Sequence, residues 1–211
     1  MFTVYEMFGI IYKMKQKYPS IDEMRALHKK YAPTPADFEL IFTHSMIICE
    51  IVKQIIITKK LSLQYDLIIA GSLLHDIGTY KLLIDVKKFD TEKYITHSIL
   101  GYNLLKQEGY ADEICRFAKN HTGVGITKEE IIEKNLPLPP KDYLAKTTEE
   151  KLVMYADKFH SKTPQFNSPQ SVRDHIQKYG DEKIQKFNDL EKMFGIPELE
   201  QLAKKYNHPL V

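Results

Sequence analysis

The chain has 211 residues, of which 30 are lysine or arginine and 28 are aspartate or glutamate, so its formal net charge is +2. This near-neutral balance gives no global field that would favour nucleic acid or an anionic membrane as a partner. Hydrophobic residues make up 43% and charged residues 27%, which is typical of a soluble globular protein. The length suits one domain with accessory elements better than two domains.

The two cysteines and the interrupted apolar stretches indicate a cytoplasmic protein that does not enter a membrane. Cys49 and Cys115 lie in apolar helical patterns and are interpreted as small buried residues rather than as a disulfide, and no Cys-x-x-Cys zinc motif is present. Charged residues such as Glu50 interrupt the apolar stretches before they reach the roughly 20 residues of a transmembrane helix. The apolar N-terminus contains Glu6 and no small-residue cleavage site follows, which argues against a signal peptide.

Helix signals dominate the first half of the chain, and convincing strand alternation is lacking. Capping residues and prolines delimit the predicted helices, which cover Phe2–Lys17, a short segment from Ser20 to Pro33, a segment from Thr34 through Ile55, and Leu63–Ile77. Gly78 directly follows the last of these helices, where a C-terminal glycine cap belongs. The polar segment Thr79–Tyr94 is predicted to be a loop, with a helical turn as an alternative for part of it, and to serve as a lid.

The second half of the chain continues the helical pattern. The predicted helices cover Ile95–Glu108, Asp112–His121, a short helix opened by a capping box at Thr127–Glu130, a helix opened by a capping box at Thr147–Glu150, and a helical region from Ser168. Three prolines exclude a helix over Leu136–Pro140, so Asn135–Lys146 is predicted to be an exposed loop and a second lid.

We therefore predict an all-α fold with a helical core over residues 34–162. An N-terminal helical extension would cover residues 1–33, and a C-terminal helical region packed on the core would cover residues 163–211. The apolar side chains of these flanking segments would either complete the core or form the face of a homodimer, and the sequence leaves both alternatives open.

Six polar residues share an unusual property, because each lies on or beside the apolar face of its own predicted helix. A single histidine on an apolar face is usually a satisfied core or surface residue, and a single aspartate near a helix end is usually a solvated or capping group. Several such groups facing one core need partners there, and imidazoles and carboxylates find them by sharing metal ions. The six residues are His44, His75, Asp76, His97, His121 and Asp157.

The ligand types narrow the choice of metal. Imidazole nitrogen and carboxylate oxygen without thiolate suit iron, manganese, nickel or zinc better than a soft metal. Six ligand residues are too many for one open catalytic ion and suit two ions bridged by a carboxylate. We predict two divalent transition-metal ions, with iron or manganese favoured and nickel, zinc or magnesium as alternatives.

At these residues the sequence resembles a known family. The segment Leu73-Leu74-His75-Asp76-Ile77-Gly78 resembles the signature of the HD superfamily of metal-dependent phosphohydrolases in its HDIG form. His44 matches the upstream histidine of that family, and Ala156-Asp157-Lys158 matches its downstream aspartate. His97 and His121 match the two additional histidines of its dinuclear branches. The resemblance covers roughly Thr34 to Ser161 and implies an all-α helical bundle.

Carried over residue by residue, the resemblance also assigns the ligands. It implies that His44, His75, Asp76 and Asp157 hold the first ion, that Asp76 bridges, and that His97 and His121 hold the second. Adjacent helical residues point about 100° apart, but near a helix end both His75 and Asp76 can reach one ion. Two cations lower the pKa of a shared water, and the hydroxide bridging them would attack phosphorus in line. Neither a G-x-S-x-G elbow nor a P-loop is present to suggest another mechanism.

Basic side chains near these ligands are candidates for holding the phosphate. Among them we favour Lys81, which follows the HDIG turn, and Lys158, which follows Asp157, over Arg116 and Lys119. The alternative is that these are solvated surface charges. The glycines of Thr122-Gly123-Val124-Gly125 would either allow the backbone to approach a substrate or only terminate a helix.

Three classes of function remain open. The leading hypothesis is a phosphohydrolase (a phosphomonoesterase, phosphodiesterase or nucleotide pyrophosphohydrolase) acting on a nucleotide or another small phosphorylated metabolite. The first alternative is a di-iron oxygenase, since a minority of similar proteins use the same ligands to activate dioxygen. The second alternative is a non-catalytic nucleotide-sensing module, and the complete ligand set argues against it.

Overall fold

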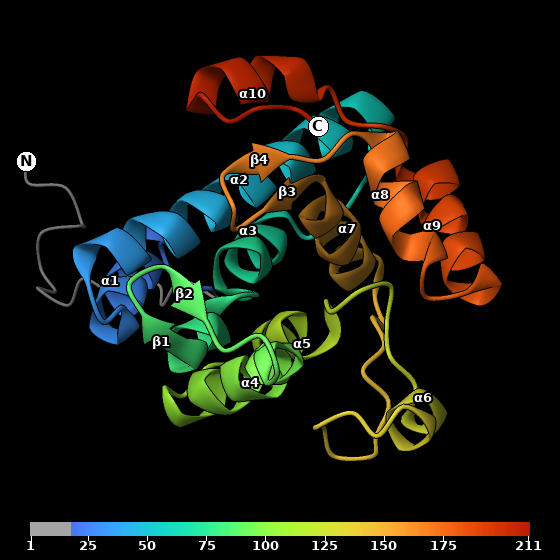
Figure 1. Cartoon of the computed structure of the whole chain (residues 1–211). Coiled ribbons are helices and arrows are strands. Elements are labelled where there is room, and N and C mark those ends of the chain that lie inside the picture. Colours follow the sequence, from blue (N-terminus) through green and yellow to red (C-terminus); the bar gives the residue numbers. More distant parts are fainter. Residues whose placement is uncertain (1–17) are drawn as a thin grey trace, which may run out of the picture.

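The computed structural model describes residues 18–211, so the helix predicted over Phe2–Lys17 lies outside the described residues. Within them the fold is all-α, as predicted (Figure 1). The α-helices are α1 (Ile21–Tyr31), α2 (Pro35–Lys59), α3 (Tyr65–Leu74), α4 (His97–Gln107), α5 (Asp112–Asn120), α6 (Lys128–Glu133), α7 (Thr148–Ala156), α8 (Pro169–Gln177), α9 (Asp181–Phe194) and α10 (Leu199–Tyr206). Short 3-10 helices cover η2 (Ile77–Leu82), η3 (Tyr94–Thr96) and η4 (Asp157–Phe159), and two antiparallel hairpins pair β1 (Leu83–Asp85) with β2 (Lys88–Phe89) and β3 (His160–Ser161) with β4 (Gln165–Phe166).

The capping residues identified in the sequence lie at the N-termini of helices in the structure. Capping boxes begin α1 at Ser20 and α6 at Thr127, with the side chain of the third helical residue reaching back to the cap in both. The box predicted at Thr147 is only half formed. The Thr147 hydroxyl accepts the N–H of Glu150, but the Glu150 carboxylate accepts from the Lys146 N–H, Arg116 and Asn120 instead.

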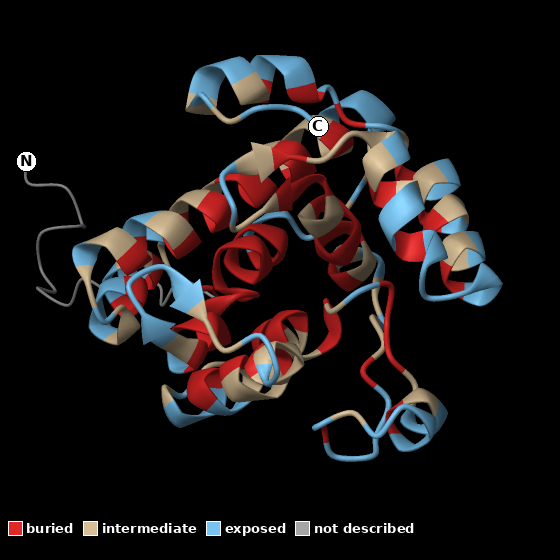
Figure 2. Ribbon diagram, viewed as in Figure 1, coloured by how far each residue is buried: buried red, intermediate tan, exposed pale blue. Residues whose placement is uncertain are grey.

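The core is built around α2, which contacts α3 and α7 and contributes fully buried side chains such as Ile41, Ile48 and Ile51. This helix is the one described segment that is long and apolar enough to cross a membrane by length and composition. Figure 2 shows the buried residues concentrated where α2, α3, α5 and α7 face one another. The metal-ligand candidates lie on these same elements or at their ends.

Both flanking segments complete this core. Met24 and Leu27 of α1 belong to the same buried cluster as the central helices, and so do Phe187 and Phe194 of α9 and Leu202 of α10. The ring of Phe194 also packs against Tyr155 of α7. These helices therefore pack on the central helices, and the predicted boundaries near residues 33 and 163 stay a prediction.

The role predicted for Gly78 is wrong. It is not a left-handed C-terminal cap but lies inside η2, without a positive φ. A Cβ atom at Gly78 would lie 2.1 Å from the carbonyl oxygen of His97 and 2.3 Å from the amide nitrogen of Gly101. Glycine is therefore required because α4 approaches the backbone that follows His75 and Asp76.

Both predicted lid loops are more structured than expected. The segment Thr79–Tyr94 contains η2 and the β1–β2 hairpin, and Thr79 and Tyr80 are buried, so its first part is not a lid. The segment Asn135–Lys146 is not fully exposed either. It forms the second limb of what we call the α6 segment, residues 122–146, where Ile126 and Tyr143 exchange backbone hydrogen bonds and form a small separate cluster with Ile131 and Leu138.

Candidate metal centre

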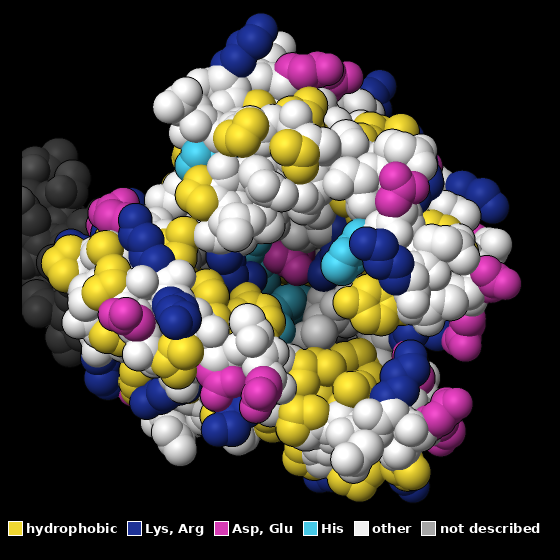
Figure 3. All heavy atoms as spheres, viewed as in Figure 1, with side chains coloured by type: hydrophobic (Ala, Val, Ile, Leu, Met, Phe, Trp, Pro, Cys, Tyr) yellow, Lys and Arg dark blue, Asp and Glu magenta, His cyan; other side chains and the backbone are white. Residues whose placement is uncertain are grey.

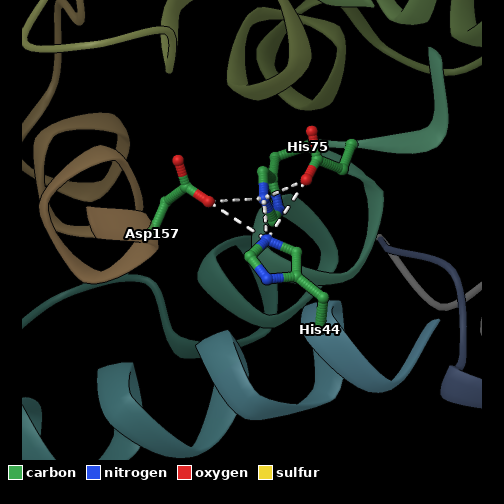
Figure 4. Close-up of side chains that lie close together, drawn as sticks. His44, His75 and Asp157 are labelled. Atoms are coloured by element: carbon green, nitrogen blue, oxygen red, sulfur yellow. Dashed lines mark hydrogen bonds and ion pairs between the residues drawn. The ribbon is translucent and has the colours of Figure 1, made fainter. Parts of the chain in front are cut away.

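The structure brings the six predicted ligand residues together in two groups. The first group is His44, His75, Asp76 and Asp157, and the second is Asp76, His97 and His121. In each group the candidate ligand atoms all lie within 4.8 Å of one another. Figure 4 shows His44, His75 and Asp157 pointing towards one another from α2, the end of α3 and the end of α7.

Asp76 divides its two carboxylate oxygens between the groups. Its Oδ2 atom lies 3.1 Å from His44 Nε2 and 3.2 Å from His75 Nε2. Its Oδ1 atom lies 3.4 Å from His121 Nε2 and 3.6 Å from His97 Nε2. One carboxylate therefore joins both sets of imidazoles, and the bridging role that the resemblance implies for Asp76 stays a prediction.

Helix ends explain how adjacent residues reach one site. His75 is the C-cap of α3 with helical backbone angles, whereas Asp76 leaves the helix at φ −104° and ψ 9°. His121 is the C-cap of α5 and Asp157 the C-cap of α7. Three helix C-termini thus converge here, and their partial negative charge favours a bound cation.

Backbone carbonyls orient three of the histidines. Nδ1 of His75 donates to Ser72 O at 2.7 Å, Nδ1 of His97 donates to Tyr94 O at 2.6 Å, and Nδ1 of His121 donates to Ala118 O at 2.9 Å. These bonds fix the tautomer in which Nε2 is the free acceptor, as in metal-binding histidines. Nε2 of each ring accordingly points towards Asp76.

His44 is oriented by a chain of imidazoles that sequence reasoning missed. Its Nδ1 lies 2.9 Å from Nδ1 of His160 in β3, and Nε2 of His160 lies 3.0 Å from Nδ1 of His208. The C-terminal residues hold His208 in place by adding to β4, where Phe166 N–H donates to Pro209 O at 2.7 Å and Val211 N–H donates to Phe166 O at 2.9 Å. Neither histidine lies in a recognisable helical pattern, so periodicity carried no signal for them.

The carboxylates stay ionised despite their burial. Burial raises the pKa of Asp76, but the Lys162 ammonium and the surrounding histidines outweigh this and hold it well below its usual range. Burial likewise raises the pKa of Asp157, and Lys158 with His44 and His75 outweighs it. The site therefore presents two negative charges that are largely shielded from solvent.

The histidines of the two groups differ in their protonation. Burial lowers the pKa of His75, but the charge of Asp76 and a hydrogen bond to Asp157 outweigh it and raise the pKa to about 9. Burial lowers the pKa of His97 to about 3, with a further contribution from His121, and burial also lowers the pKa of His121. The second pair is therefore neutral, as ligands must be, whereas a cation entering the first group displaces a proton.

The residues fit a divalent metal. Both carboxylate oxygens of Asp76 are fully buried and have no hydrogen-bond partner of good geometry. Buried charges are retained when they are paired or bind metals. A nitrogen and oxygen donor set around this buried carboxylate, which pairs with the Lys162 ammonium, matches the ligand preferences of divalent transition metals.

Two of the nearby lysines reach the site and one does not. Lys158 donates to Asp157 Oδ2 at 2.8 Å, and Lys162, which sequence reasoning missed, pairs with Asp76. Lys81 is exposed, with its ammonium 5.2 Å from the centre of the Tyr31 ring, so the structure does not bring it to the ligands as predicted. The reason is local, since η2 buries Tyr80 and Leu82 on either side and turns Lys81 outwards.

A cavity of about 480 Å³ opens beside the second group. His97, His121, Asp157, Lys158 and Lys162 line one end of it. In Figure 3 it is the hollow in which acidic, basic and histidine side chains are visible between hydrophobic ones. The predicted Gly123 and Gly125 also line it, both with positive φ, in the turn that follows His121.

Comparison with known proteins gives related sequences from archaea. The chain is 40% identical over 99 residues to an uncharacterized protein of Methanocaldococcus jannaschii, which covers 47% of this chain and 52% of that protein. It is 37% identical over 101 residues to a tRNA (cytidine(56)-2'-O)-methyltransferase of Thermoplasma volcanium and 44% identical over 91 residues to one of Picrophilus torridus. These matches cover 48% and 43% of this chain. The chain thus matches about half of the first relative and about a quarter of each methyltransferase.

The chain also resembles a solved structure and matches a protein-family profile. The HD domain of the L. monocytogenes phosphodiesterase PgpH, solved in complex with cyclic-di-AMP, aligns with a TM-score of 0.49 at 15% identity, covering 79% of this chain and 93% of that one. The HD domain profile matches residues 41–162, which is more than half of the chain and includes all six ligand residues. The chain therefore belongs to the HD domain family of metal-dependent phosphohydrolases, and the His and Asp side chains of that domain form groups that could hold divalent metal.

Proposed function

We propose that the protein hydrolyses a phosphate ester or phosphoanhydride with two divalent ions. His44, His75, Asp76 and Asp157 would hold the first ion, and Asp76, His97 and His121 the second. The observation that carries this proposal is the position of Asp76, whose Oδ2 faces His44 and His75 while its Oδ1 faces His97 and His121. A mononuclear site would not need this division.

The donor set supports iron or manganese as the native ions, with nickel, zinc or magnesium as alternatives. Bound divalent ions lower the pKa of water and neutralise the charge that develops on phosphoryl oxygens. The chain itself supplies the orientation of the imidazoles, the two carboxylate charges and a cavity that admits substrate on the side of His97 and His121.

Lys158 and Lys162 are the groups that would hold the phosphate. Both line the cavity, and each is paired with a ligand carboxylate. When cations bind those carboxylates, the two ammonium groups are repelled from them, and a phosphate oxygen becomes their favourable partner. The substrate would be a nucleotide or another small phosphorylated metabolite.

Metal analysis combined with an anaerobic hydrolysis screen tests this function. Protein purified without chelators should carry close to two ions per chain, restorable with iron, manganese or nickel after chelation. It should release phosphate or nucleoside monophosphate from a nucleotide and phosphate-ester panel under anaerobic conditions with manganese, zinc or iron. Turnover that requires both iron and oxygen would instead establish an oxygenase, and binding of nucleotides without any turnover would establish a sensor.

A further inference from the structure

The cavity extends well beyond the space that a phosphate group needs. Its volume of about 480 Å³ is within the range of sites that enclose an entire small organic ligand. Only one end is formed by the metal-ligand candidates and the two lysines. The remainder lies between the α6 segment and the C-terminal helices α8 and α9, so it is available to the group that leaves the phosphate.

Apolar side chains form the walls of this second part. Val124, Ile126 and Leu136 contribute from the α6 segment, and Ile176 from α8. Figure 3 shows hydrophobic side chains gathered along the edge of the hollow. Such walls favour an uncharged, largely apolar group, because a charged group would lose its hydration without gaining a partner.

The charges are distributed unevenly along the cavity. At the metal end, Lys158 and Lys162 become free to bind phosphate once cations take their carboxylates. Lys183, which also lines the cavity, is already engaged, because its Nζ donates to Gly125 O at 2.6 Å and to Glu130 Oε2 at 2.5 Å. The same Glu130 carboxylate lies 3.5 Å from Lys134 Nζ. This arrangement suits one phosphate at one end and not a polyphosphate along the whole cavity.

An exposed aromatic ring lies on the cavity wall. Tyr179, directly after α8, lines the cavity and is 58% exposed. The ring of His175 contacts it at 5.5 Å between centres, with an interplanar angle of 61°. An exposed tyrosine ring next to an apolar wall is a favourable surface for stacking a flat ring of a ligand.

We propose that this part of the cavity binds a nucleobase against Tyr179, and that the substrate is a nucleoside monophosphate. The placement of the phosphate beside the metal-ligand candidates rests on the function proposed above. Hydrolysis breaks the bond between phosphorus and the nucleoside oxygen, water supplies the new oxygen on phosphorus, and a proton from that water goes to the departing nucleoside hydroxyl. The products are a nucleoside and inorganic phosphate.

The first experiment compares nucleoside 5′-monophosphates with glycerol 3-phosphate, which carries the same phosphate without a ring. The ratio of the two kcat/KM values should fall about tenfold in Tyr179→Ala, consistent with the loss of one base–aromatic stack. Tyr179→Phe should retain the ratio, because the ring remains. Tyr65→Ala, a matched control at an exposed tyrosine on α3, should also retain it. An equal loss for both substrates, or a preference for nucleoside triphosphates over monophosphates, would overturn the proposal.

The second experiment does not depend on hydrolysis. Calorimetry with metal-loaded protein should detect binding of at least one of adenosine, guanosine, cytidine and uridine, none of which has a phosphate to lose. Tyr179→Ala should weaken this binding about tenfold, and Tyr65→Ala should not. Nucleoside binding that depends on Tyr179 without phosphate release from any ester would support the base site while rejecting the hydrolase. Absence of binding by all four nucleosides would overturn the base site whatever the hydrolysis screen shows.

Discussion

The two ligand groups share Asp76 but differ in depth and in charge. His44 and His75 of the first group are completely buried, and Asp157 adds a second carboxylate there. His97 and His121 of the second group line the cavity and have no carboxylate besides Asp76. We infer that the first group holds its ion more tightly, and that the second group is the one that meets the substrate.

The charges around the histidines explain why the two groups differ in protonation. In the first group the carboxylates raise the pKa of His75 to about 9, so this group attracts any cation, including a proton. In the second group burial lowers the pKa of both His97 and His121, with a further contribution from His121 on His97 and from His75 on His121, so both rings are neutral. If two ions are bound, His97 and His121 would hold the one that a substrate reaches from the cavity, while His44 and His75 would hold the more buried one.

The largest effect is expected from Asp76→Asn, which removes the charge that both groups share. Activity should fall by about 10³ or more, in line with the loss of a major electrostatic contribution, and the metal content should fall below one ion per chain. Steady-state kinetics and elemental analysis of the same preparation measure both. Retention of two ions with a small rate loss would show that the groups are independent.

A matched pair of alanine variants separates the two groups. His97→Ala should keep the first ion, lose the second, and lower the rate by roughly 10². His44→Ala should weaken the tighter site, so it should bind less metal in total than His97→Ala at the same free manganese concentration. Equilibrium dialysis provides the comparison. Equal metal loss in the two variants would contradict the proposed difference in affinity.

A smaller loss is expected when the phosphate-binding lysines are neutralised. Lys162→Met and Lys158→Met should each lower kcat/KM by about tenfold or somewhat more, because a hydrogen bond to a charged group contributes roughly 1.5–3 kcal/mol. Lys81→Met is the matched control, since Lys81 is exposed above Tyr31. If Lys81→Met were the most damaging of the three, η2 would have to rearrange on metal binding.

The smallest effect concerns the support of the first group by His28. His28 Nε2 donates to Leu73 O at 2.7 Å, and its Nδ1 accepts from the Tyr80 hydroxyl at 2.9 Å, near the end of α3 that carries His75. Burial lowers the pKa of His28 from 6.5 to about 4. Between these values the unfolded chain binds a proton that the folded chain does not, so stability falls as the pH drops through this window.

The contribution of His28 amounts to about 3 kcal/mol at most. Urea unfolding of chelator-treated protein at pH 7 and pH 4.5 measures it without interference from bound metal. The difference in unfolding free energy between the two pH values should shrink by about 2–3 kcal/mol in His28→Gln, whose side chain does not titrate. An unchanged difference would assign the acid sensitivity to other groups.

Much of the site could be predicted because its ligands follow helix signals. His44 repeats with the apolar stripe of α2, and His75, His121 and Asp157 come where apolar helices end. Their apolar faces singled these residues out, and the resemblance to the HD family assigned them to two ions that share Asp76. The structure adds the atoms, since Oδ2 of Asp76 faces His44 and Oδ1 faces His121.

Lys162 and His160 could not be predicted for a physical reason. They lie in and beside a hairpin whose strands are two residues long, too short to show alternation. His28 resembles part of a solvated His-Lys-Lys run, yet it is completely buried because α1 packs on α2 and α3. Lys81 was misplaced because η2 replaced the expected loop and set the direction of its side chain.

Because the C-terminal residues pair with β4, the part of the site that depends on them forms late in synthesis. His44 leaves the ribosome long before His208, and at roughly 5–20 residues per second the interval is many seconds. During that time His160 lacks the partner that orders its ring against His44. The nascent chain can therefore pack helices α1 to α7 around a core, but His160 would reach its final position against His44 only after the C-terminal residues have paired with Phe166.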